Sequence, residues 1–218
     1  MSPGSRPGHR AAAMRRRVAL ISVGVACVAL IASGCAARFD PTGPCTTDGS
    51  VAGAYPDLEA QVPRVFRGNA PASVDSGRAC TAVGLGTLAG HGVTELRFAG
   101  ARWTTGSESG LSLALFESGG GPALTRDWLA EFYEIGARAG KNVTSVEPSD
   151  YRVDELTGRR IDVLNGESFQ TVVVWERGGR IEAAVIADAI REIQTREAHD
   201  AVVRDAVDAW RTVDAAGT

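Results

Sequence analysis

The 218-residue chain has few histidines, cysteines and lysines. It contains three histidines, four cysteines and a single lysine, Lys141. Beyond residue 34 only His91 and His199 remain as histidines, and neither has a partner at metal-ligand spacing, so we predict no metal site. The N-terminal apolar run, Val18–Ala32, has 15 residues, fewer than the roughly 20 that a membrane-spanning helix needs.

Basic charge is also scarce outside the N-terminal segment. Residues 1–34 hold five of the 23 basic residues and none of the 26 acids. The remaining chain therefore carries 18 basic and 26 acidic residues, a formal charge of −8. Nucleic acids and anionic lipids are bound chiefly through basic patches, so we expect neither nucleic-acid binding nor a polybasic membrane contact.

Two glycine-rich motifs suggest chemistry that their context does not support. Residues 84–89 fit a loose dinucleotide-binding pattern, but a β-type segment follows them instead of a helix. Residues 106–110 resemble a nucleophile elbow, but the central residue is Glu108 and not serine. We therefore predict no cofactor and no catalytic residue. One enzymatic alternative is a hydrolase that uses carboxylates such as Glu131 and Glu134, which lie three residues apart on a predicted helix.

The N-terminal segment has the layout of an export signal. Three arginines at 15–17 precede the apolar run Val18–Ala32, and Ser33, Gly34 and Cys35 follow it. This junction resembles the lipobox of bacterial lipoprotein precursors. The resemblance implies a mature chain that begins at Cys35, carries lipid on that cysteine, and is anchored at the extracytoplasmic face of a bacterial membrane.

Other interpretations of the same segment remain open. It could be a permanent anchor helix, or a signal peptide that is cleaved beside Cys35 without lipidation. The paired arginines are similar to a twin-arginine export signal, although the residues that usually flank the pair are missing. Translation could also begin at Met14, directly before the arginines.

The four cysteines separate into three groups on this interpretation. Cys27 leaves with the signal segment and Cys35 carries lipid. Cys45 and Cys80 remain in an oxidising compartment, where disulfides persist. We predict a Cys45–Cys80 disulfide; the alternative is two unpaired buried thiols.

We divide the chain into three parts. Residues 1–34 form the lipoprotein signal peptide, and residues 35–56, which contain three prolines and many small polar residues, form a flexible tether. Residues 57–218 form one α+β domain with an antiparallel sheet of about five or six strands and two main helices packed on it.

The main elements follow from local patterns. We expect β-hairpins at residues 94–117 and 159–176, the second with an Asn165-Gly166 turn that uses positive φ angles, and a further turn at Gly178-Gly179. Residues 171–175 should form a central strand covered on both faces. Helices are expected from Thr125 to Ala139 and from Thr195 to Val213. On the second helix the apolar stripe is Val202, Ala206, Ala209, Trp210 and Val213, with His199 on the polar side.

This order of elements loosely resembles PsbP/Mog1-like sandwiches, which is an analogy of fold without a shared motif. We expect a membrane-anchored lipoprotein that acts as a non-enzymatic accessory or ligand-binding protein. A cleft between the sheet and the Trp128 helix could hold an amphipathic ligand, or this interface could be a filled core. The alternatives are the carboxylate hydrolase and a structural partner of a membrane complex.

Overall fold

The computed structural model describes residues 39–216, which form one α+β domain around an eight-stranded antiparallel sheet with strand order β1-β2-β3-β4-β8-β7-β6-β5. The predicted lipid site, Cys35, and the predicted signal segment lie outside the described residues. The strands are β1 (Gly49–Val51), β2 (Ser73–Ala79), β3 (Glu95–Thr104), β4 (Gly110–Gly120), β5 (Val143–Val153), β6 (Leu156–Asn165), β7 (Ser168–Arg177) and β8 (Arg180–Ala189). The helices are α1 (Pro56–Glu59), α2 (Ala82–Leu85), α3 (Thr87–Gly90), α4 (Arg126–Arg138) and α5 (Arg196–Ala216).

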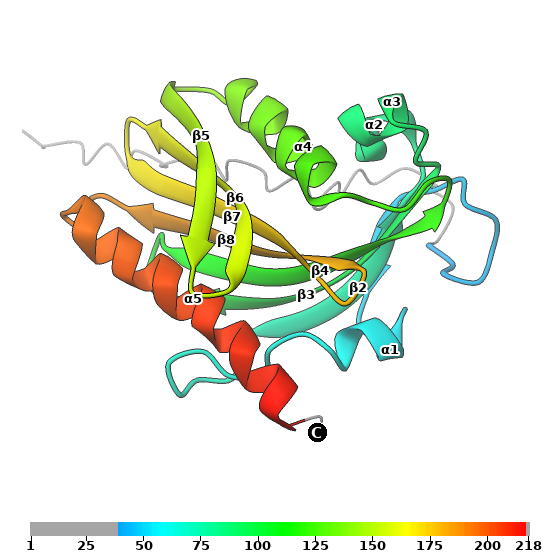
Figure 1. The fold of residues 1–218 in the computed structure, drawn as a ribbon, viewed down its shortest axis with the longest axis horizontal. Coiled ribbons are helices and arrows are strands. Elements are labelled where there is room, and N and C mark those ends of the chain that lie inside the picture. The colour runs from blue at the N-terminus through cyan, green and yellow to red at the C-terminus, as the bar shows by residue number, and fades with distance from the viewer. Residues whose placement is uncertain (1–38, 217–218) are drawn as a thin grey trace, which may run out of the picture.

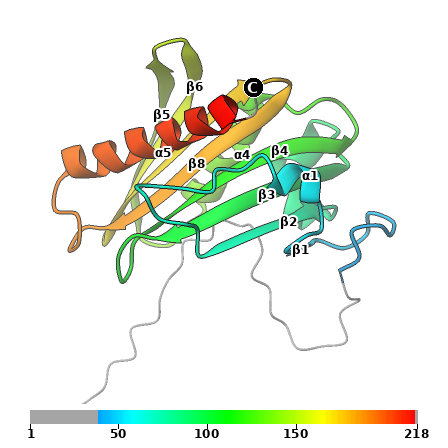
Figure 2. The same cartoon turned by 90° about the horizontal axis from the view of Figure 1, so that it is seen from below.

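Helices cover both faces of the sheet and make a three-layer arrangement. The long helix α5 and the short α1 lie on one face, whereas α4, α2 and α3 lie on the other (Figures 1 and 2). Two main apolar clusters match these layers: one joins α5 to the sheet, and the other joins α4, α2 and α3 to it. The two predicted main helices are therefore confirmed, and they pack on opposite sides.

Strand β7 shows why the sheet needs cover on both faces. Val173 and Trp175 belong to the cluster under α5, whereas Val174, between them, belongs to the cluster under α4. All three side chains are at most 1% exposed. Because side chains alternate between the two faces of a strand, a nearly continuous apolar run such as this one is stable only inside a sheet. The predicted central strand is confirmed.

The long helices begin where their capping residues predict. Thr125 caps α4 by accepting a hydrogen bond from the backbone N–H of Trp128, and Thr195 accepts one in the same way from Ala198 ahead of α5. Val202, Ala206, Ala209 and Trp210 are buried as expected, while the side chain of Val213 lies outside the described part of the chain. Among residues 39–216, no helix combines the length and apolar character that crossing a bilayer requires.

The prediction of five or six strands is wrong, because the sheet has eight. Strand β2 has no apolar alternation, since its buried side chains include Ser76 and Arg78. Hydrogen bonds, not hydrophobic contacts, hold these two side chains in place. Strand β1 has only three residues, and β5 is a largely exposed edge strand. Hydrophobic periodicity is weak in all three strands.

The β6–β7 hairpin is confirmed, but its turn works differently from the prediction. Asn165 pairs with Ser168, which leaves Gly166 and Glu167 as the loop, and the positive φ angles expected at Asn165 and Gly166 do not occur. Instead, the Asn165 side-chain oxygen accepts hydrogen bonds from the Glu167 N–H and the Ser168 hydroxyl. The Gly178-Gly179 turn has positive φ at both residues, 60° and 78°.

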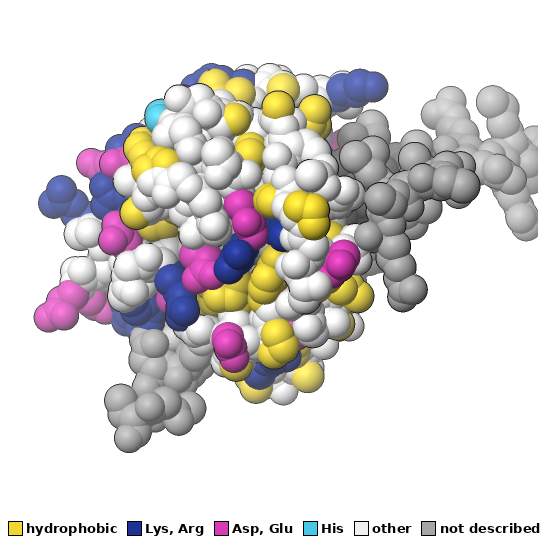
Figure 3. Space-filling model, turned by 90° about the vertical axis from the view of Figure 1, so that its right-hand side faces the viewer, with side chains coloured by type: hydrophobic (Ala, Val, Ile, Leu, Met, Phe, Trp, Pro, Cys, Tyr) yellow, Lys and Arg dark blue, Asp and Glu magenta, His cyan; other side chains and the backbone are white. Residues whose placement is uncertain are grey.

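The first described residues lie against the sheet edge formed by β1 and β2. The Nη2 atom of buried Arg78 lies 2.9–3.0 Å from three backbone carbonyl oxygens, those of Asp40, Gly43 and Pro44. The Phe39 ring lies against Gly49, where an added Cβ would be 2.6 Å from it. Residues 39–51 thus wrap one end of the domain, which Figure 3 shows face-on. The division of the chain at residue 56 stays a prediction, but this part of the expected tether contacts the sheet.

A disulfide joins Cys45 to Cys80, with their Cα atoms 5.3 Å apart. Beside it, the Asp48 carboxylate accepts hydrogen bonds from the backbone N–H groups of Cys80 and Thr81. The pKa of Asp48 lies below its usual value because these hydrogen bonds outweigh the opposing effect of burial. The bond closes a loop across a sequence separation of 35 residues.

We predict that replacing both Cys45 and Cys80 with serine lowers the free energy of unfolding by about 3–4 kcal/mol at most, because the unfolded chain regains the loop entropy. Urea denaturation of a chain that begins at residue 36 measures the difference. In that chain, unreduced wild-type protein should show no reactive thiol after denaturation. Two reactive thiols would contradict the disulfide.

Candidate functional site

A cleft lies between α4 and strands β5 and β6. Its volume is about 330 Å³. Apolar atoms of Ile161 and Pro148 line the strand side, and Ala130 lines the helix side. The remaining lining residues are charged and of both signs: Arg126, Asp127, Glu131, Glu134 and Arg159. The cleft therefore combines apolar and charged walls.

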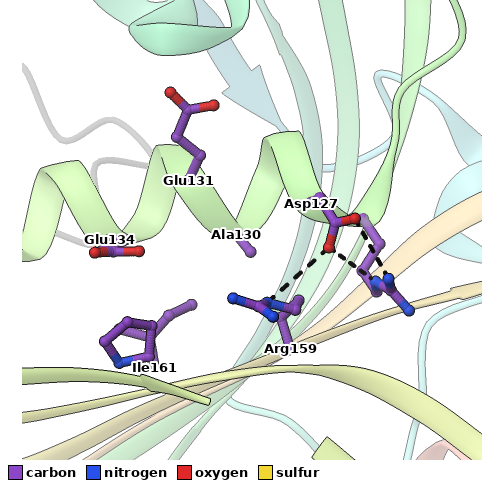
Figure 4. Close-up of a pocket in the computed structure, with 8 residues that line it drawn as sticks. Asp127, Ala130, Glu131, Glu134, Arg159 and Ile161 are labelled. Atoms are coloured by element: carbon purple, nitrogen blue, oxygen red, sulfur yellow. Dashed lines mark hydrogen bonds and ion pairs between the residues drawn. The ribbon is translucent and has the colours of Figure 1, made fainter. Parts of the chain in front are cut away.

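Asp127 is the centre of the charged network at one end of this cleft. In Figure 4 its carboxylate points toward Arg159 from the helix above the sheet. The Asp127 Oδ1 atom lies 3.2 Å from Arg126 Nε and 4.0 Å from Arg159 Nε. Arg159 also pairs with Asp150 of β5 at 2.7 Å. Because the Asp127 side chain is 64% exposed, water or a ligand can reach it directly.

The carboxylates considered for a hydrolase, Glu131 and Glu134, both line the cleft. Glu131 points away from β6 in Figure 4, and its Oε2 atom lies 2.7 Å from Nε2 of His91. The His91 ring stacks on Trp128 at a centroid distance of 4.6 Å and an angle of 8°. Glu134 pairs with Arg138 one turn further along the helix, at 2.7 Å. Each carboxylate thus has a different partner, His91 for Glu131 and Arg138 for Glu134.

The interface between α4 and the sheet behind this cleft is packed. Leu129 is fully buried and Ala130 is 6% exposed. Trp128, Phe132 and Tyr133 pack against the same apolar cluster from the helix. Of the two alternatives for this interface, the filled core is therefore the one observed, and the cleft lies beside it with polar walls.

A second cluster lies on the opposite face of the sheet, under α5, where sequence reasoning missed it. His199 is 0% exposed and not on the polar side of its helix, so that prediction is wrong. Its Nδ1 atom lies 2.6 Å from Asp188 Oδ2 on β8, and its Nε2 atom lies 2.8 Å from Thr171 Oγ1 on β7. A hydroxyl, an imidazole and a carboxylate in this order are also found in the catalytic triads of hydrolases.

The direction of the hydrogen bonds shows that the cluster is arranged differently from a triad. The Thr171 hydroxyl donates to Asp162 Oδ1 at 2.6 Å. Burial acts to raise the pKa of Asp162, but hydrogen bonds from Arg160 and Thr171 outweigh it and hold the pKa below its usual value, so Asp162 is an acceptor. His199 Nε2 must then carry a hydrogen and donate to Thr171, so it cannot take the hydroxyl proton as a general base does. Thr171, Asp188 and His199 are all 0% exposed, which also excludes a substrate.

These bonds attach α5 to three strands. A hydrogen is also shared between His199 Nδ1 and Asp188 Oδ2, which lie 2.6 Å apart. Asp188 Oδ1 has no hydrogen-bond partner within the described part of the chain. Nearby, Arg160 bonds both Asp162 and Asp200 of α5, and Arg196 lies 3.3 Å from Asp162.

The sequence segment that resembles a nucleophile elbow is the loop between β3 and β4. The exposed carboxylate of Glu192 accepts hydrogen bonds from the Ser107 N–H and hydroxyl and from the Ser109 hydroxyl. Hydrogen bonds from Ser107 and Ser109 lower the pKa of Glu192 to about 2. The loop is therefore a structural contact with the end of β8, in agreement with its interpretation as a hairpin loop.

No protein-family model, curated protein or solved structure matches this chain. Among residues 39–216, no group of three His, Cys, Asp or Glu side chains is placed to hold a metal ion.

We predict that Asp188→Ala destabilises the fold by roughly 3 kcal/mol or more, because it leaves a buried polar partner without its hydrogen bond. Asp188→Asn should cost much less, since the side-chain amide keeps a hydrogen bond with His199 Nδ1 while Nε2 still donates to Thr171. Chemical denaturation at pH 7 measures both variants. Equal losses for Asn and Ala would contradict the shared-hydrogen arrangement.

Proposed function

We propose that the protein is a lipid-anchored, non-enzymatic binding protein on the extracytoplasmic face of a bacterial membrane, and that the cleft between α4 and β6 binds a small amphipathic ligand with a cationic head. The anchor argument comes from the junction of Ser33, Gly34 and Cys35 after a short apolar run. The Cys45–Cys80 disulfide is consistent with an oxidising compartment.

The observation that carries the ligand proposal is the composition of the cleft walls. Three acids and two arginines line it, so its formal charge is −1, and the exposed carboxylate of Asp127, with that of Glu134 further along the helix, favours a cationic group. The apolar atoms of exposed Pro148 offer a contact for a short alkyl chain, whereas Ile161 beneath it is only 1% exposed. Ligand pockets commonly combine apolar walls with a few charged groups that set orientation.

The alternative of a carboxylate hydrolase has less support. Glu134 forms an ion pair with Arg138, and the Glu131 carboxylate points away from β6 and lies 2.7 Å from Nε2 of His91. A glycosidase needs one of its two carboxyl groups protonated and ready to donate to the leaving group. A carboxylate paired with a cation is stabilised in the ionised form, which is unfavourable for that role.

The anchor is tested by growing cells with an alkyne analogue of palmitate. We expect the wild-type chain to be labelled and to fractionate with membranes, because Cys35 is its acylation site. A Cys35→Ala variant should be neither labelled nor membrane-bound, whereas the Cys27→Ala variant serves as the matched control and should behave like the wild type. An unlabelled wild-type product would contradict the lipoprotein proposal.

The ligand site is tested with hexylamine, and hexanoate provides a probe of equal length and opposite charge. We expect hexylamine to shift the backbone amide signals of α4 and β6 in NMR spectra, because the acids attract its ammonium group. Asp127→Asn and Glu134→Gln should each weaken binding about tenfold, equivalent to ~1.4 kcal/mol.

The control for these variants is Glu155→Gln, which removes an exposed acid in the β5–β6 turn that does not line the cleft. This variant should bind hexylamine like the wild type. Equal shifts with hexanoate, or no shift with hexylamine, would contradict the cationic-ligand proposal.

A further inference from the structure

The length of chain between the predicted lipid site, Cys35, and Phe39, the first described residue, limits where the domain can lie. Four peptide units connect Cys35 to Phe39. A chain spans at most about 3.3–3.6 Å per residue, so the two Cα atoms are at most about 14 Å apart whatever the conformation. A flexible tether over residues 35–56 would instead reach roughly 75 Å.

The attachment of residues 39–48 to the sheet makes this short distance significant. Phe39 lies against Gly49, and the Arg78 guanidinium lies 6.0 Å from the Phe39 ring centroid. Arg78 also binds the carbonyl oxygens of residues 40, 43 and 44, and the disulfide follows at Cys45. The chain is therefore held at several successive points, with no free length between Phe39 and the domain to act as a spacer.

The same end of the domain carries exposed apolar side chains. Large exposed hydrophobic residues in the described part of the chain are Val51, Val65, Val83 and Ile135. Val51 is two residues from Gly49, on which Phe39 lies, and it is 51% exposed. Val83 is three residues from Cys80, the disulfide partner of Cys45, and it is 88% exposed. Figure 3 shows apolar side chains spread over this end of the molecule.

Charge at this end gives no electrostatic attraction to anionic lipid. Residues 39–51 contribute two acids, Asp40 and Asp48, and Arg78 beside them is 4% exposed and engaged with backbone carbonyls. The other charged side chains on this end are of both signs (Figure 3). Contact with a bilayer would therefore depend on the lipid anchor and on apolar side chains. Such contact should change little with salt or with anionic lipid, unlike binding through a basic patch.

We propose that residues 39–51 and α2 form a membrane-facing end, with Val51 and Val83 in contact with the bilayer surface, so that the anchored domain has one fixed orientation. This inference rests on the proposed lipidation of Cys35. In Figure 1 the β5–β6 hairpin, one wall of the cleft, lies toward the other end of the molecule, so the cleft remains accessible from the aqueous side.

The test uses the lipidated mature protein in phosphatidylcholine nanodiscs that contain a gadolinium-chelating headgroup lipid. The gadolinium should broaden the backbone amide signals of Val51 and Val83 strongly, and those of the β5–β6 turn at Asp154 and Glu155 little. The pattern should be the same when a third of the lipid is phosphatidylglycerol. Equal broadening over the whole domain would overturn the fixed orientation.

Two variants and one control variant make the test sharper. A flexible 20-residue Gly/Ser insertion between Cys35 and Phe39 leaves every contact of the described domain intact, and it should make the broadening uniform. Val83→Glu should reduce broadening at Val51 and Val83, whereas Ile135→Glu, an equal change on α4, should not. An unchanged pattern in the insertion variant would contradict the role of the short connection.

The outcome also separates this proposal from the one on which it rests. If Cys35 is not acylated, both fail. If Cys35 is acylated but the domain shows uniform broadening, the anchor proposal stands and the membrane-facing end is rejected. If broadening is confined to another surface, the domain is oriented by contacts other than Val51 and Val83, and the assignment of this end is wrong.

Discussion

Burial of the central strands on both faces is the constraint on which the rest of the structure depends. In β7, Val173 and Trp175 face α5 while Val174 faces α4, so neither helix can be removed without exposing apolar sheet. The two faces then take different roles. Under α5, the polar side chains of Thr171, Asp188 and His199 are fully enclosed. Beside α4, charged side chains remain open to water in a cleft of about 330 Å³. Accessibility, more than residue type, therefore distinguishes the structural cluster from the candidate binding site.

Much of the fold could be predicted from the sequence wherever apolar periodicity is strong. The hairpins, the caps at Thr125 and Thr195 and the two long helices agree with their patterns. Strands β1, β2 and β5 could not be found in this way, because β1 is short, β5 is an exposed edge and β2 buries Ser76 and Arg78 with polar partners. Such partners come from residues far away in the sequence, and a local pattern contains no information about them.

The buried histidine cluster did leave a signal in the sequence. His199 precedes Val202, Val203 and Ala206 at helical spacing, and Asp188 continues the alternation of Ala184 and Ile186 on β8. Periodicity thus places both side chains on the buried face, but their polarity favours a position on the protein surface. The cleft is a different case: Glu131 and Glu134 were recognisable as neighbours on a helix, whereas their separate pairing with His91 and Arg138 depends on tertiary contacts.

The central claim is that a folded binding domain is held close to a membrane by lipid on Cys35. Intact mass measurement of the protein extracted from its own membranes tests this most directly. We expect the mass of residues 35–218, less two hydrogens for the Cys45–Cys80 disulfide, plus the mass of the attached acyl groups. A mass that includes residues before Cys35, or one that corresponds to residues 35–218 without lipid, would contradict the account.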